Sequence, residues 1–238
     1  RDEDVVGGSP GEIHGRFSAL VRRRDVQEDQ LVGSLGVVAL GQLHRVARVA
    51  QVDARFADDP PVIVLDEAYY EFAEEPDYPD AMALLRRRPR TIILRTFSKA
   101  YGLAGIRIGY GISHPSIWSW ISRIRQPFNV NSLALVAGMA ALEDQAFLKD
   151  TLDLTRGERA FLGEALRGRG FEVTESQTNF VLVDFARDTG ALFEVLLAKG
   201  VIVRPMGGYG LPTCARISIG TREENLRLIE VLDQVLGS

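Results

Sequence analysis

The chain of 238 residues has a formal net charge of −4 and is 46% hydrophobic, which allows a sizeable core in one large or two small domains. The mildly negative charge provides no field that would recruit nucleic acid, and no apolar run approaches the about 20 residues of a membrane-spanning helix. The single cysteine excludes an internal disulfide and favours a reducing compartment, so we expect a cytoplasmic protein with neither nucleic acid nor membrane as partner.

Residues 1–60 form an N-terminal segment with few structural signals. Their apolar positions allow one strand over 31–40 and one helix over 43–49. The glycine-rich turn at 7–11 follows no apolar strand, so it lacks the context of a phosphate-binding turn. His14 and His44 have no partners at a metal-binding or catalytic spacing, and we expect no metal site.

Two apolar strands follow, and each ends in residues that can do chemistry. The strand at 61–65 leads into Asp66 and Tyr69, and the strand at 91–96 leads into Lys99. If a helix near 81–88 joins them as parallel neighbours, their carboxyl ends meet at one edge of the sheet, where ligands bind in open α/β folds. The sequence therefore predicts one pocket that contains the carboxylate, the phenol and the amine.

Lys99 is unusual in a chain that uses arginine for nearly all of its positive charge. Only Lys99, Lys149 and Lys199 are lysines, so the 28 basic residues include 25 arginines. A lysine amine can form a Schiff base once it is deprotonated, whereas a guanidinium cannot. An amine kept at this strand end indicates covalent chemistry.

The next elements extend the α/β pattern to about residue 145. We expect a strand at 106–112, a helix around 118–124, a helix over 132–148 and a further helix that ends near 169. This alternation favours a largely parallel sheet that is covered by helices.

The remaining residues, 146–238, predict a small α+β domain. Strands are expected at 171–174, 180–185, 201–204 and 215–219, with a helix at 189–199. Thr221 caps a final helix in a capping box with Glu224. The expected buried stripe of that helix consists of Leu226, Ile229, Leu232 and Val235.

Three motifs in this order resemble a known family. They are the strand end at 66–69, the loop Thr-Phe-Ser-Lys-Ala-Tyr-Gly-Leu-Ala-Gly at 96–105, and Gly-Ile-Arg-Ile-Gly-Tyr at 105–110. Together they resemble the fold-type I aminotransferases that use pyridoxal 5'-phosphate, and within them the histidinol-phosphate aminotransferase family. The resemblance runs from about Pro61 to Leu236. It implies an α/β fold with a mostly parallel, truncated large-domain sheet over 61–145 and a small α+β domain over 146–238, with 1–60 unmatched.

The resemblance also implies roles for individual residues. Lys99 forms the Schiff base with pyridoxal phosphate and moves protons at the substrate carbon, Asp66 pairs with the ring nitrogen, and Tyr69 donates to the ring's phenolic oxygen. The cofactor's phosphate is held by Thr96, Ser98 and Arg107. In the small domain, Arg204 and Arg216 bind the anionic groups of the substrates.

The implied activity is amino transfer from histidinol phosphate to 2-oxoglutarate in histidine biosynthesis, with an amino donor and a 2-oxo acid as partners and a homodimer as the assembly. An aromatic aminotransferase and a threonine-phosphate decarboxylase share the same anchor residues. A truncated relative that does not catalyse is a further alternative, because residues 1–60 lack the family's early strands, phosphate turn and stacking aromatic ring.

Overall fold

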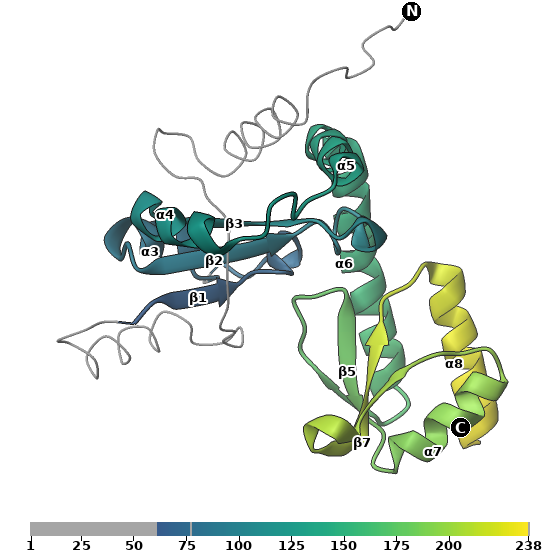
Figure 1. Cartoon of the computed structure of the whole chain (residues 1–238). Helices are drawn as coiled ribbons and strands as arrows, with labels where there is room; N and C mark the ends of the chain where they lie inside the picture. Colours follow the sequence, from purple (N-terminus) through teal and green to yellow (C-terminus); the bar gives the residue numbers. More distant parts are fainter. Residues whose placement is uncertain (1–60, 77, 238) are drawn as a thin grey trace, which may run out of the picture. The chain divides into compact units, whose positions relative to one another are not determined.

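A computed structural model describes residues 61–76 and 78–237, which divide into two compact units (Figure 1). Unit 1 contains the described residues up to Tyr70 and the range Glu75–Leu148, and unit 2 contains Glu71–Glu74 and residues 149–237. The strand and helix expected within residues 1–60 lie outside the described part. None of the helices in that part is both long and apolar enough to cross a membrane.

Unit 1 is built on a three-stranded sheet in the order β1-β2-β3. The two strands that end in the predicted site residues are parallel neighbours, as the sequence predicted, and Val64 pairs with Ile92. The predicted connecting helix is also present, and its N-cap Asp80 accepts a hydrogen bond from the amide of Ala83. The bounds are β1 (Ile63–Asp66), α3 (Ala81–Arg87), β2 (Thr91–Thr96) and β3 (Gly109–Ser113).

The pairing of β3 differs from the parallel arrangement that the alternation of elements favoured. β3 runs antiparallel to β2, with Ile93 opposite Ile112. The connection contains one 3-10 turn, η2 (Ala104–Ile106), and no α-helix that would carry the chain back across the sheet. Instead the amide of Phe97 donates to the carbonyl of Ile108 at 3.2 Å, which returns the chain beside β2. The described sheet is therefore mixed.

Helices after β3 complete unit 1. Ile121 of α4 (Pro115–Ile124) packs with Val64 and Ile92, so α4 covers one face of the sheet. The prediction of one helix over 132–148 was wrong about where the helix ends. Helix α5 (Ser132–Glu143) stops at Glu143, and Asp144 is its C-cap. The Asp144 carboxylate accepts from the amide of Phe147 at 2.9 Å and so begins the next helix.

Unit 2 packs helices against an antiparallel sheet in the order β4-β5-β7-β6. Alternate residues of β5 and β7 are buried, such as Val183 beside Ala215, so one face of the sheet holds the core. The helices are α6 (Gln145–Arg167), α7 (Thr189–Ala198) and α8 (Arg222–Leu236); the strands are β4 (Glu172–Thr174), β5 (Phe180–Asp184), β6 (Arg204–Met206) and β7 (Leu211–Ser218).

Two expectations for this unit need correction. The strand expected at 201–204 begins only at Arg204, because Val201 and Val203 are buried in the core without pairing to a neighbouring strand. On α8 the capping box of Thr221 and Glu224 is confirmed, but Leu226 is 50% exposed. The buried face of α8 is centred on Leu228, Ile229, Val231 and Leu232.

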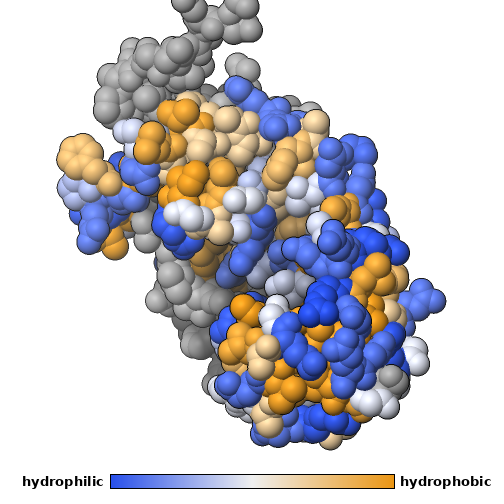
Figure 2. All heavy atoms as spheres, turned by 90° about the vertical axis from the view of Figure 1, so that its right-hand side faces the viewer, coloured by the Kyte–Doolittle hydropathy of each residue, from blue (hydrophilic) through white to orange (hydrophobic). Residues whose placement is uncertain are grey.

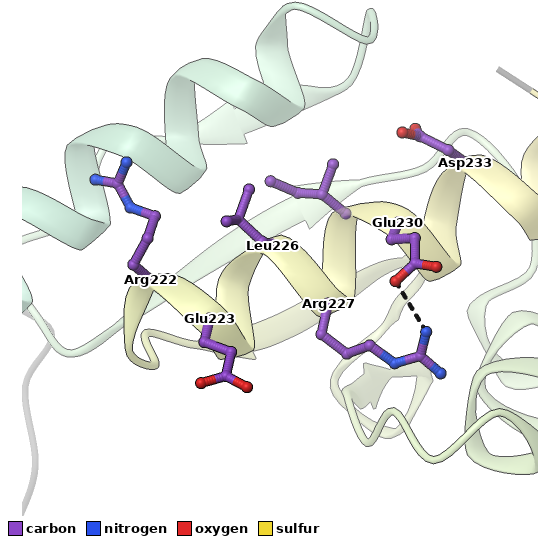
Figure 3. Close-up of a pocket in the computed structure, with 7 residues that line it drawn as sticks. Arg222, Glu223, Leu226, Arg227, Glu230 and Asp233 are labelled. Carbon is purple, nitrogen blue, oxygen red and sulfur yellow. Dashed lines mark hydrogen bonds and ion pairs between the residues drawn. The ribbon is translucent and has the colours of Figure 1, made fainter.

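Leu226 instead lines a hollow of about 870 Å³ along α8 (Figure 3). Its other lining residues are mostly charged, and Arg227 and Glu230 pair with each other at 3.0 Å. The lining residues are Arg222, Glu223, Leu226, Arg227, Ile229, Glu230 and Asp233. None of these lining residues is a lysine or carries a hydroxyl or a thiol.

Candidate functional site

A cavity of about 400 Å³ opens at the carboxyl ends of β1 and β2 in unit 1. The structure brings together around it five side chains that the sequence singled out: Asp66, Thr96, Ser98, Lys99 and Arg107. Its remaining lining residues are Ala68, Leu94, Arg95 and Ala104. The volume lies within the range of small-molecule sites, which is about 300–1,000 Å³.

The strand ends explain why these groups converge. Asp66 is the last residue of β1 and pairs with Leu94 of the parallel neighbour, so Asp66 and the end of β2 lie at one edge of the sheet. The Asp66 carboxylate accepts from the amide of Ala68 at 3.0 Å, and the Thr96 hydroxyl accepts from the amide of Ser98 at 3.0 Å. Both contacts fix the backbone just beyond the strands, where the site residues begin.

Tyr69 lies beside Lys99, although it is not among the residues that line the cavity. The Lys99 Nζ is 5.2 Å from the centroid of the Tyr69 ring. Both side chains are partly buried. The Lys99 amine thus lies near an aromatic ring and near a strand that ends in a carboxylate. Such surroundings can orient a lysine nucleophile.

Arg107 reaches this site from an unfavourable backbone conformation. Its φ angle is +61°, in the left-handed region that residues with a side chain seldom adopt. One guanidinium nitrogen donates to the carbonyl of Ala104 at 2.6 Å. The side chain is exposed and its remaining donors suit the oxygens of a phosphate.

A buried ion pair next to the cavity was missed from the sequence. Arg95 of β2 donates from Nη2 to the Glu67 carboxylate at 3.0 Å, and their side chains are 4% and 1% exposed. The sequence contained one signal for this pair: Arg95 lies inside one apolar strand, and Glu67 lies directly after another. Charged residues are seldom buried without a partner.

Arg204 and Arg216 lie in unit 2, and the structure does not bring them into the cavity of unit 1. They are direct cross-strand partners on β6 and β7. Arg204 Nη2 donates to the hydroxyl of Tyr209 at 3.0 Å, and the Arg216 guanidinium lies 4.8 Å from the ring centroid of Phe180. Two like charges opposite each other destabilise a sheet.

The sequence matches the family model for aminotransferases of class I and II over residues 42–232, a range that begins within the segment 1–60. A histidinol-phosphate aminotransferase of Anaeromyxobacter sp. (strain Fw109-5) is 48% identical over 178 residues, which cover 74% of this chain and 49% of that protein. The chain therefore spans about half the length of the curated relatives that it matches.

Solved structures share the fold. The histidinol-phosphate aminotransferase of Sinorhizobium meliloti in complex with pyridoxal-5'-phosphate has a TM-score of 0.70 and 35% identity, covering 79% of this chain and 53% of that one. The L-threonine-O-3-phosphate decarboxylase of Porphyromonas gingivalis has a TM-score of 0.68 and 25% identity, covering 84% and 61%. The expected α/β fold of this class is confirmed.

Proposed function

The chain belongs to the aminotransferase class I and II family, and we propose that it carries the pyridoxal-phosphate site of an enzyme that transfers the amino group of histidinol phosphate to 2-oxoglutarate. The observation that carries the proposal is the convergence of Lys99, Asp66, Ser98 and Arg107 on one cavity. The names of the similar proteins support histidinol phosphate as the donor. In this proposal residues 61–145 belong to the large domain and 146–238 form the small domain.

The donor set of the cavity fits pyridoxal phosphate. Lys99 offers an amine for the aldehyde, and Asp66 offers a carboxylate for the ring nitrogen. Thr96, Ser98 and Arg107 offer hydroxyl and guanidinium groups for a phosphate; Thr96 is the last residue of β2, and Ser98 and Arg107 lie on the same connection as the amine. An aldehyde, a basic nitrogen and a phosphate on one small molecule would satisfy all of these groups.

When bound, pyridoxal phosphate supplies an electron sink for the charge that develops at the substrate carbon. Lys99 would hold the cofactor covalently and, once displaced by a substrate amine, would carry the proton to and from the substrate carbon. The Asp66 carboxylate would keep a proton on the ring nitrogen, because an adjacent negative charge favours the protonated form. The Tyr69 hydroxyl would donate a hydrogen bond to the ring oxygen.

Substrate recognition is assigned to Arg204 and Arg216. A phosphorylated amino alcohol and a 2-oxo diacid are both anionic, so one site must neutralise different anions in turn. The cross-strand register of Arg204 and Arg216 supports this role, because it places two positive charges on neighbouring strands and a bound anion would relieve their repulsion.

We further propose a cytoplasmic homodimer. The single cysteine and the biosynthetic relatives support the location. Apolar residues gather over α5 on the face drawn in Figure 2, and Ile124, Phe128 and Leu133 near its start are 82%, 95% and 80% exposed. Such a group of exposed apolar side chains favours an interface. Sedimentation should give the mass of two chains, and a monomer at micromolar concentration would contradict this assembly.

Amino transfer is tested by adding pyridoxal phosphate to the purified protein and following visible absorption. A band should appear and then change when glutamate is added, and histidinol phosphate should yield glutamate from 2-oxoglutarate. Faster transfer from an aromatic amino acid, or release of carbon dioxide from threonine phosphate, would assign a different substrate. A band that no amino donor changes would identify a relative that binds the cofactor without catalysing.

A further inference from the structure

Glu67 and Arg95 form an ion pair that is almost completely removed from solvent. Arg95 donates from both Nε and Nη2 to the same carboxylate oxygen, Oε2, at 3.1 and 3.0 Å. Their side chains are 1% and 4% exposed. Burial of two charges carries a large desolvation penalty, and a pair of apolar residues would fill the same volume without it. The pair therefore calls for an explanation other than stability.

Aromatic rings enclose the pair. The Arg95 guanidinium lies 3.7 Å from the centroid of the Tyr70 ring, and the hydroxyl of Tyr78 donates to Oε1 of Glu67 at 3.5 Å. The two tyrosine rings contact each other edge to face, with centroids 5.9 Å apart. Arg95 is thereby held by a stacked ring as well as by the carboxylate, which restricts it to one geometry.

The pair joins the two strand ends that carry the proposed cofactor site. Glu67 directly follows Asp66, and its amide donates to the carbonyl of Leu94 at 2.8 Å. Arg95 follows Leu94 in β2. The last residue of β2, Thr96, comes next and leads into the loop that contains Lys99. Since neighbouring residues of a strand point to opposite faces, Glu67 and Arg95 lie on the face opposite Asp66 and Thr96.

We propose that the Glu67–Arg95 pair is a positioning device that fixes the Asp66 carboxylate relative to Lys99 across the ends of β1 and β2. This inference rests on the proposed function, because it assumes that both residues hold pyridoxal phosphate. The ladder pairing of β1 with β2 ends at Asp66 and Leu94, and one further backbone hydrogen bond joins Glu67 to Leu94. The charged pair adds two directed hydrogen bonds between the side chains at this end of the strands, which an apolar pair could not supply.

The test replaces the pair by apolar residues of similar size, Glu67→Leu together with Arg95→Met, in the full chain. A matched control is Asp233→Leu with Arg169→Met, which removes an ion pair of unit 2 between α8 and the residues just after α6, with distances of 2.6 and 2.7 Å. Thermal unfolding, the Kd for pyridoxal phosphate and the pH midpoint of the cofactor's absorption band are measured for all three proteins.

We expect the Glu67/Arg95 double variant to unfold at a temperature similar to that of the parent. Its Kd for pyridoxal phosphate should rise about tenfold, which is the lower end of what loss of outer-shell support costs at ligand sites. The pH midpoint of its band should also move, because Asp66 would no longer be held against the ring nitrogen. The control should keep the parental Kd and midpoint.

The outcomes separate the positioning role from the proposed function. A double variant with the parental Kd and midpoint would overturn the positioning role while the cofactor site stands. If the parent protein shows no absorption band with pyridoxal phosphate, both the positioning role and the proposed function are overturned. If the double variant does not fold, Arg95→Lys retains the charge but loses the forked geometry, and the same shifts in Kd and midpoint are expected. Parental values in Arg95→Lys would contradict the proposal.

Discussion

Arg107 shows how a single residue can serve binding at the expense of its own backbone. Its left-handed conformation costs on the order of 1 kcal/mol for a residue with a side chain. Glycine would adopt this conformation without strain, yet the chain places a guanidinium there, beside the hydroxyls that line the cavity. The proposed binding of phosphate would explain why an arginine occupies this position.

Arg107→Gly should separate stability from binding. Relief of strain and the larger entropy of the unfolded chain nearly cancel, so the free energy of unfolding should change by less than about 1 kcal/mol. Loss of charge-assisted hydrogen bonds to phosphate, about 1.5–3 kcal/mol in total, should weaken pyridoxal phosphate binding roughly 10- to 100-fold. Calorimetric titration and thermal unfolding measure the two effects, and Arg107→Asn should behave alike. Unchanged affinity in both variants would contradict the phosphate role.

At the residue scale the sequence predicted those groups whose chemistry is local. Lys99 and Asp66 could be found because a strand end followed by a reactive side chain is visible without a structure, and Arg107 was identified through the resemblance of its motif to the family. The Glu67–Arg95 pair could not, because its meaning depends on which strands are neighbours and in which register they pair.

At the scale of elements, the close approach of β3 to β2 depends on one glycine. A Cβ placed on Gly109 would lie 2.8 Å from the carbonyl oxygen of Arg95, closer than real side chains approach backbone atoms. Thr96 is its partner across the ladder, so any shift of β3 would be felt at the start of the lysine loop.

Gly109→Ala should therefore destabilise the protein by about 1–3 kcal/mol, the usual cost of overpacking, and should weaken cofactor binding. Gly105→Ala is the matched control, because a Cβ there would meet nothing within 4 Å and Gly105 has no positive φ angle. Urea unfolding of both variants provides the comparison. Equal destabilisation by the two substitutions would show that close packing of β3 on β2 is not the cause.

Helix α8 is attached to α6 by a network that responds to pH. Arg222 donates to both Glu158 oxygens at 3.0 and 3.1 Å, and Asn225 donates to one of them at 2.9 Å. The hydrogen bond from Arg222 lowers the pKa of Glu158, with Asn225 adding to the effect and partial burial opposing it. Because this pKa is depressed on folding, the contribution is complete above the unfolded pKa of about 4.3 and is lost as the pH falls through the folded value.

Glu158→Gln should reduce the free energy of unfolding at pH 7 by up to about 1 kcal/mol, since the Arg222 side chain is 55% exposed and solvent weakens the pair. As the pH falls through the lowered pKa of folded Glu158, the difference from the parent should shrink, because Glu158 then becomes protonated in both states. Urea titrations across pH 3–7 measure this dependence. If the difference in the free energy of unfolding between Glu158→Gln and the parent stays constant over that pH range, the charge of Glu158 is not responsible for it.

Element boundaries were predicted less well than element types. The capping box of α8 was visible because its residues lie next to each other in sequence. The end of α5 and the start of β6 were misplaced, because Asp144 ends one helix and caps the next, and because Val201 and Val203 alternate like a strand without a pairing partner. Pairing direction in the sheet likewise depended on a loop that closes through one backbone hydrogen bond.

At the scale of the whole molecule, the proposed function assigns separate tasks to the two units. Unit 1 contains the groups that are proposed to hold the cofactor, and unit 2 contains the arginine pair that is proposed to bind anionic substrates. The chain spans about half the length of its curated relatives, so catalysis by these two units is a stronger claim than cofactor attachment. Attachment depends on Lys99 and its neighbours, and it is the step on which the proposed function rests.

The most direct measurement is reduction with borohydride in the presence of pyridoxal phosphate, followed by peptide mass spectrometry. The two other lysines, Lys149 and Lys199, serve as internal controls, since they lie in unit 2. We predict a stable pyridoxyl group on Lys99 in nearly every molecule at a cofactor concentration that leaves Lys149 and Lys199 unmodified. Equal labelling of all three lysines, or an unmodified Lys99, would contradict the assignment.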